Sequence, residues 1–238
     1  MRVAIVENTA VTHHGQVGVA LAEAGVMFDL FRPFAGDGLP APGDYAGLIV
    51  FGGEQSALDD ARHPYLPGLA ARMAEFGAAG RAVLGICLGA QLLARGHGAT
   101  NRIGTAPEFG WCEVHRTPEA EGDPLMAALP ASFRSFQWHC DTFDLPAGAV
   151  HLAEAQGVAM QGFRVGARSW GMQFHFEANR AVVAHWSRAF APQAEALAPG
   201  WGAVHPREAA AHGPQADDAG LALARAWVAQ RGGHAGKR

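Results

Sequence analysis

The chain has 238 residues, of which 49% are hydrophobic, and a formal net charge of −4 at pH 7. This length can bury a full core, and we expect residues 1–238 to form a single domain. The charges are not clustered, so we expect neither nucleic acid nor a membrane as a partner. No apolar run is long enough to span a bilayer, and three widely spaced cysteines make no disulfide framework, which favours a cytoplasmic protein.

Short apolar runs alternate with helical patterns in the first hundred residues. We expect strands at 2–6, 27–31, 46–51 and from 82, and helices at 15–24, 65–78 and from about 89. Strands that are apolar along their whole length are typical of a parallel sheet with helices on both faces.

The second half of the chain has a different pattern. Strand-like runs at 111–116, 133–138, 150–153, 158–163 and 168–175 follow one another without long helices between them. They indicate partly antiparallel strands attached to the parallel core. Helices are expected at 178–190 and 217–230, while 191–214, rich in Pro, Gly and Ala, remains unassigned.

Cys87 ends one of the apolar runs and lies two residues from Gly85 and from Gly89. A side chain presented on a sharp strand-to-helix turn needs small residues at these positions, because backbone segments crowd there. The start of the next helix favours a negative charge on the sulfur, and the free N–H of Leu88 could face an oxyanion. The pattern is typical of a nucleophile, and a buried core thiol is the alternative.

His175 and Glu177 form the second candidate pair. In an extended strand they lie on one face, while Phe174 and Phe176 point to the other face, into the core. The histidine could act as a general base and acid, with the carboxylate fixing its tautomer. Alternatively, His175 has no catalytic role and is simply one of the 12 histidines of the chain, and Glu177 is a first-turn acid of the next helix.

Gly52 and Gly53 directly follow an expected buried strand. Two glycines there free the backbone to turn its N–H groups toward a ligand, which would give a second oxyanion donor. The alternative is a plain turn between a strand and a helix.

A cluster of polar side chains follows Trp138 and comprises His139, Cys140 and Asp141. These residues are too close together to ligate one metal ion comfortably, and no other cluster has the usual zinc spacing, so we expect no metal. Substrate contact and loop packing both remain possible.

The only lysine is Lys237, and no G-x-G-x-x-G follows a strand. We therefore expect no cofactor.

In type and order, these motifs resemble those of the class I glutamine amidotransferases, above all the glutaminase domain of GMP synthetase and its free-standing relatives. The four segments are Gly52-Gly53, Gly85 to Gln91, Trp138 to Asp141, and Gly171 to Glu177. The resemblance extends over about residues 2–190. It implies an α/β fold, namely a flavodoxin-like three-layer sandwich with a mixed, mainly parallel central sheet and additional antiparallel strands.

The resemblance also implies a role for each matching residue. Cys87 would be the nucleophile, His175 the base and acid, and Glu177 the orienting carboxylate. Gly53 and Leu88 would supply oxyanion donors, and the expected substrate contacts are Gly52, Gln91, His139 and Asp141. Phe176 stands where most relatives place a proline.

The implied reaction is hydrolysis of the glutamine side-chain amide through a γ-glutamyl thioester. The ammonia acceptor would be a separate synthetase subunit. One alternative is a γ-glutamyl hydrolase or peptidase that uses the same triad without a partner. Another is a binding module without activity, since a shared fold does not establish a function.

Overall fold

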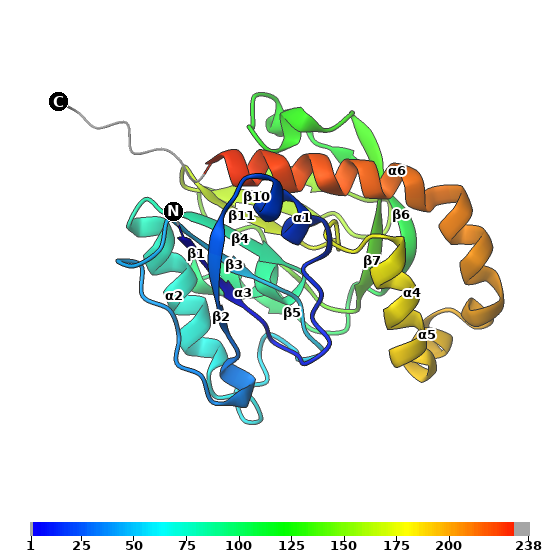
Figure 1. Ribbon diagram of the computed structural model, residues 1–238, viewed down its shortest axis with the longest axis horizontal. Coiled ribbons are helices and arrows are strands. Elements are labelled where there is room, and N and C mark those ends of the chain that lie inside the picture. Colours follow the sequence, from blue (N-terminus) through cyan, green and yellow to red (C-terminus); the bar gives the residue numbers. More distant parts are fainter. Residues whose placement is uncertain (1, 231–238) are drawn as a thin grey trace.

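The computed structural model describes residues 2–230 (Figure 1), so Lys237 lies outside the described residues. Five strands form the parallel part of a nine-stranded sheet, in the order β2-β1-β3-β4-β11. Their bounds are β1 (Arg2–Val6), β2 (Met27–Phe31), β3 (Gly47–Val50), β4 (Ala82–Ile86) and β11 (Ser169–Met172).

Antiparallel strands continue the sheet beyond β11. The order is β10-β9-β6-β7, with bounds β10 (Gly162–Val165), β9 (Val150–Glu154), β6 (Glu108–Arg116) and β7 (Ser132–His139). A separate small sheet pairs β5 (Asn101–Arg102) with β8 (Thr142–Phe143). The mixed, mainly parallel sheet with added antiparallel strands is therefore confirmed.

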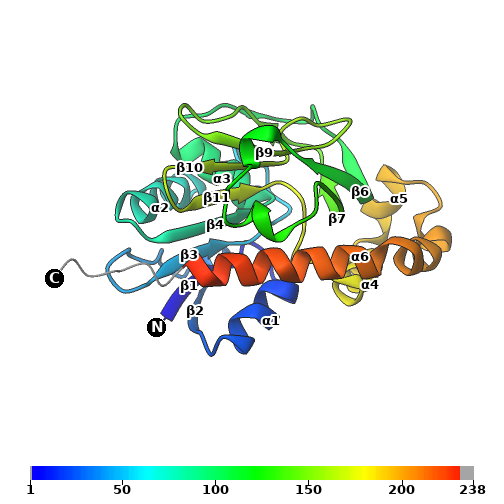
Figure 2. The same cartoon turned by 90° about the horizontal axis from the view of Figure 1, so that it is seen from above.

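Helices cover both faces of the sheet (Figure 2). One face carries α1 (Gly15–Glu23) and α6 (Trp201–Gln230), and the other carries α2 (Leu66–Ala78) and α3 (Leu88–Gly96). Strand β1 shows why both faces need a cover, because its apolar side chains alternate between the two faces of the sheet. Val3 and Ile5 pack in the cluster with α1 and α6, while Ala4 and Val6 pack in the cluster with α2 and α3. The flavodoxin-like three-layer arrangement is confirmed.

The remaining two α-helices lie at the antiparallel end of the molecule. They are α4 (Arg180–Ala189) and α5 (Ala191–Leu197), and a third apolar cluster joins this region to β6, β7 and α6 through Trp111, Phe136 and Trp201. Three short 3-10 helices cover Pro33–Ala35, Pro118–Ala120 and Met126–Ala128. Among residues 2–230, no helix is both long enough and apolar enough to cross a membrane.

Several expected elements need correction. The strand expected at 158–163 is β10, at Gly162–Val165, and the strand expected at 168–175 ends at Met172. The helix expected from 217 begins at Trp201, and the unassigned stretch 191–214 is largely helical. The prolines within α6, Pro206 and Pro214, obscured this helix in the sequence, since they remove backbone donors. The helix bends but continues (Figure 1).

Candidate functional site

Cys87 is the single residue between β4 and α3. Its φ is 52° and its ψ is −110°, and no other non-glycine residue within 2–230 has a positive φ. Such a conformation is costly and persists only where the surroundings impose it. Here the Cys87 N–H donates to the Met172 carbonyl at 2.8 Å, and the Cys87 carbonyl accepts from the Ala90 N–H at 2.9 Å. The turn thus holds the sulfur in a strained, fixed position at the start of α3.

The two glycines around Cys87 are required by close packing of the backbone. A Cβ at Gly85 would lie 2.3 Å from the Gly89 carbonyl oxygen, and a Cβ at Gly89 would lie 2.1 Å from the Val50 carbonyl oxygen. Both distances are far below van der Waals contact. The spacing that the sequence shows is therefore explained by how tightly β3, β4 and α3 approach one another.

His175 and Glu177 are hydrogen-bonded to each other, with 2.8 Å between His175 Nδ1 and Glu177 Oε1. The expectation that they lie in an extended strand is wrong, because β11 ends at Met172 and His175 makes only one isolated antiparallel bridge, to Phe136. The side chains nevertheless meet, and their residues are only 7% and 1% exposed. Phe174 and Phe176 lie in the core, as predicted.

The backbone of this segment is held by two helices. The Gln16 N–H at the start of α1 donates to the Glu177 carbonyl at 2.9 Å. A Cβ at Gly220 of α6 would lie 2.1 Å from the Phe176 carbonyl oxygen, so α6 lies directly against it. The alternative that Glu177 is a first-turn acid of α4 is wrong, since it precedes the N-cap residue Asn179.

His175 is positioned to carry a proton. Burial is the largest influence and by itself lowers the pKa of His175, but the negative charges of Glu177 and Cys87, with hydrogen bonds to both, together raise that pKa well above its usual value.

Burial raises the pKa of the Cys112 thiol to about 11. Burial, followed by the charges of Asp141 and Cys87, raises the pKa of Cys140. Of the three free cysteines within residues 2–230, Cys87 is the one that lies beside His175 in this structure.

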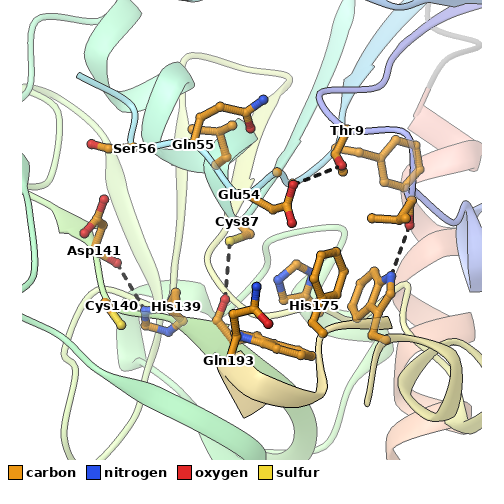
Figure 3. Close-up of a pocket in the computed structure, with 18 of the residues that line it drawn as sticks. Thr9, Glu54, Gln55, Ser56, Cys87, His139, Cys140, Asp141, His175 and Gln193 are labelled. Atoms are coloured by element: carbon orange, nitrogen blue, oxygen red, sulfur yellow. Dashed lines mark hydrogen bonds between the residues drawn. The ribbon is translucent and has the colours of Figure 1, made fainter. Parts of the chain in front are cut away.

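These side chains open into a cavity of about 720 Å³ (Figure 3). All nine residues expected from the sequence line it, although they come from four separate segments: Gly52, Gly53, Cys87, Leu88, Gln91, His139, Asp141, His175 and Glu177. Within residues 2–230, no group of three or more His, Cys, Asp or Glu side chains could hold a metal ion.

Gly52 and Gly53 lie where other residues would collide with the site. A Cβ at Gly52 would lie 3.1 Å from the His175 Cε1 atom, and a Cβ at Gly53 would lie 2.3 Å from the Gln55 side-chain oxygen. The absence of a side chain at Gly52 thus gives the imidazole room beside the backbone that follows β3.

The inner wall of the cavity, formed by Gln91, His139 and Asp141, is held by its own hydrogen bonds. Gln91 Nε2 donates to the Asp141 carbonyl at 3.3 Å, and His139 Nδ1 lies 3.1 Å from the same oxygen. His139 Nε2 lies 3.1 Å from Glu108 Oε2, and Asp141 Oδ1 accepts from the Gly104 N–H at 2.8 Å. These bonds fix the shape of the inner wall.

Another side of the cavity, of which only Trp138 belongs to a motif quoted above, was missed in the sequence. We call it the outer wall, and its residues are Trp138, Trp186, Phe190, Gln193 and Leu197. The Trp186 ring packs edge-on against the His175 ring, with 5.1 Å between centroids, and Trp138 lies 5.9 Å from Phe190. Trp186 and Phe190 share a helical face with buried Val182, so their pattern indicated core packing alone.

Comparison with known proteins agrees with the fold and identifies the family. The model of the family "Glutamine amidotransferase class-I" matches residues 20–183, and the chain belongs to this family. A crystal structure of a glutamine amidotransferase from Thermotoga maritima has a TM-score of 0.83 and 26% identity, covering 95% of this chain and 98% of that one. Another, from Methylobacillus flagellatus, has a TM-score of 0.80 and 27% identity, covering 100% and 98%.

Two curated relatives match over shorter segments. The glutamine amidotransferase-like protein YfeJ of Salmonella typhimurium is 31% identical over 159 residues, which is 65% of this chain and 66% of YfeJ. The glutamine-hydrolysing GMP synthase of Aeropyrum pernix is 31% identical over 157 residues, which is 63% of this chain but only 28% of that enzyme. The match therefore leaves most of the second relative uncovered.

Proposed function

We propose that this chain hydrolyses the side-chain amide of glutamine, with Cys87 as nucleophile, His175 as acid and base, and Glu177 as the orienting carboxylate. The observation that carries the proposal is a strained, nearly buried cysteine that shares one cavity with a hydrogen-bonded histidine and carboxylate. Membership in the class I glutamine amidotransferase family supports the same chemistry.

In the proposed first half-reaction, the Cys87 thiolate attacks the γ-carbonyl carbon, and backbone N–H groups of Gly53 and Leu88 stabilise the oxyanion. The His175 imidazolium gives its proton to the amide nitrogen, the C–N bond breaks, and ammonia leaves. Each oxyanion donor in such sites contributes about 3–4 kcal/mol. Gly52 and the inner wall are proposed to contact the amino acid end of glutamine.

In the second half-reaction, neutral His175 takes a proton from water as that water attacks the γ-glutamyl thioester. The C–S bond breaks, glutamate leaves, and the sulfur is free for another turn. Glu177 holds the imidazole Nδ1 throughout, so that Nε2 is the nitrogen that exchanges protons.

We further propose that the ammonia passes to a synthetase carried on a separate subunit, in keeping with the similarity to GMP synthases. Glutamine turnover by the isolated chain that does not respond to any synthetase subunit would contradict this part of the proposal.

A second candidate is a γ-glutamyl hydrolase that works alone. The volume of the cavity favours it, because the space exceeds what glutamine fills.

The test is release of glutamate from glutamine by the purified chain, compared with Cys87→Ser and with Cys112→Ser as a matched cysteine control. We expect activity in the wild type and in Cys112→Ser, and none in Cys87→Ser. A γ-glutamyl electrophile should label Cys87, as identified by peptide mass spectrometry. Equal turnover by Cys87→Ser would contradict the proposed nucleophile.

A further inference from the structure

The cavity is larger than glutamine requires. Glutamine has about ten non-hydrogen atoms, which at about 30 Å³ for each, the share of a water molecule in the liquid, fill at most about 300 Å³. The cavity measures about 720 Å³, within the range of about 300–1,000 Å³ seen for ligands of drug size. More than half of the space is thus available to a larger group on the same substrate.

The chemistry decides where that group would lie. In the proposed reaction the departing nitrogen must face His175, which protonates it. The His175 ring packs against Trp186, and the Cys87 sulfur lies 3.9 Å from the Trp138 carbonyl oxygen. A substituent on the departing nitrogen would therefore extend along the outer wall, while the inner wall faces the glutamyl portion.

The outer wall is suited to an uncharged, apolar substituent. Four of its five side chains are aromatic or aliphatic, Gln193 is amphipathic, and none carries a charge. Four of the five residues follow Val183, the last residue matched by the family model, and they come from the later part of α4 and from α5. Figure 3 shows Gln193 beside the hollow that holds Cys87 and His175.

We infer that the outer wall is a leaving-group subsite, and that the preferred substrates are γ-glutamyl amides of amines with an apolar, aromatic-sized substituent. This inference rests on the proposed thioester chemistry but not on an ammonia acceptor. The thiolate displaces the amine, which takes the His175 proton and leaves as a neutral amine, and water then releases glutamate. The subsite binds the substituent through apolar contact with the aromatic rings.

The test compares three compounds that all yield glutamate once ammonia or the amine has left. Glutamate release is measured for L-glutamine, L-γ-glutamyl-ethylamide and L-γ-glutamyl-phenethylamide. The last two both release primary alkylamines through the same bond cleavage, so a large preference between them reports mainly binding of the phenyl group. We expect kcat/KM to be at least about tenfold higher for the phenethylamide than for the ethylamide.

Two variants test whether the outer wall causes the preference for the phenethylamide. In Leu197→Ser we expect the phenethylamide-to-ethylamide ratio of kcat/KM to fall by about fivefold or more, because apolar surface in the subsite is lost. Ala191→Ser, on the same helix but exposed and outside the cavity, should keep the ratio. The ratio is taken within each preparation, so a smaller fraction of folded enzyme cancels.

The outcomes separate the subsite from the proposed function. A ratio near one in the wild type, with glutamine hydrolysed, would overturn the subsite and leave the glutaminase proposal intact. An unchanged ratio in Leu197→Ser would likewise overturn the assignment to the outer wall. Absence of glutamate from all three compounds would contradict the proposed function and, with it, the subsite.

Discussion

The reaction side of the cavity and its outer wall are held in place by different means. On the reaction side, Cys87 and His175 are 6% and 7% exposed, and backbone hydrogen bonds and glycine contacts hold them at the sheet. Apart from Trp138 on β7, the outer wall lies on two short helices, where Gln193 is exposed and Trp186 donates a single hydrogen bond of 3.2 Å to the Val11 carbonyl. The contrast suggests that the reaction depends on rigid geometry, whereas the choice of departing amine depends on surfaces that can vary.

The largest effect is expected on the reaction side, from His175→Asn. Glutamate formation should fall by at least about 10⁴-fold, because the proton donor and acceptor is gone. Alkylation of Cys87 by iodoacetamide at neutral pH should also slow, since no imidazolium faces the sulfur. His115→Asn, at an exposed position on β6, is the matched control. Retention of most activity in His175→Asn would show that the reaction does not depend on the fixed geometry of the reaction side.

Glu177→Gln should have the next largest effect, reducing kcat by about 10²–10⁴-fold. Its pH dependence gives a second readout. The charge of Glu177 helps to raise the pKa of His175, so its loss lowers that pKa, and the imidazolium persists only to a lower pH. The alkaline limb of the kcat/KM profile should therefore move to lower pH. An alkaline limb at the wild-type position would show that Glu177 does not act through His175. Glu75→Gln, on the exposed face of α2, is the control.

The sequence indicated the reaction side well, because steric rules act over a few residues there. Gly85, Cys87 and Gly89 make one local turn, so their spacing alone shows the need for small neighbours. His175 and Glu177 also lie close in sequence, and they meet even though the backbone is not the extended strand that was expected.

The outer wall could not be predicted in the same way, since its position depends on contacts between distant segments. Pro206 and Pro214 suggested a break where α6 continues, because packing of buried residues on both sides of the prolines, Trp201, Gly213 and Ala216, outweighs the local preference. Trp186 and Phe190 had the pattern of a core-facing helix, and only the tertiary structure shows that they face a cavity.

Gly89→Ala tests how rigidly the reaction side is held. The new Cβ would lie 2.1 Å from the Val50 carbonyl oxygen, so β3 and α3 would have to separate. We expect the free energy of unfolding to fall by about 1–3 kcal/mol, measured by chemical denaturation, with a loss of activity. Gly43→Ala, which has open space around it, should change it by less than about 0.5 kcal/mol. Equal stability of the two variants would mean that the turn can relax.

The smallest effect is expected on the outer wall, from Trp186→Phe. The ring contact with His175 is retained, but the Trp186 Nε1–H that donates to the Val11 carbonyl is lost. One such bond contributes about 1 kcal/mol, so unfolding measurements should show a loss of that size.

Trp111→Phe is the matched control for this variant, since Trp111 is buried and its Nε1 has no hydrogen-bond partner within residues 2–230. Both changes remove the same ring atoms, but Trp111 is buried and Trp186 is half-buried, so Trp111→Phe sets an upper limit on the packing cost. A loss of stability in Trp186→Phe that reaches or exceeds this limit would therefore indicate the hydrogen bond to Val11. Turnover of glutamine by Trp186→Phe should remain within about fivefold of the wild type, because His175 and Glu177 keep their backbone supports. A loss approaching that of His175→Asn would instead show that Trp186 holds the imidazole, which would make the outer wall part of the reaction geometry.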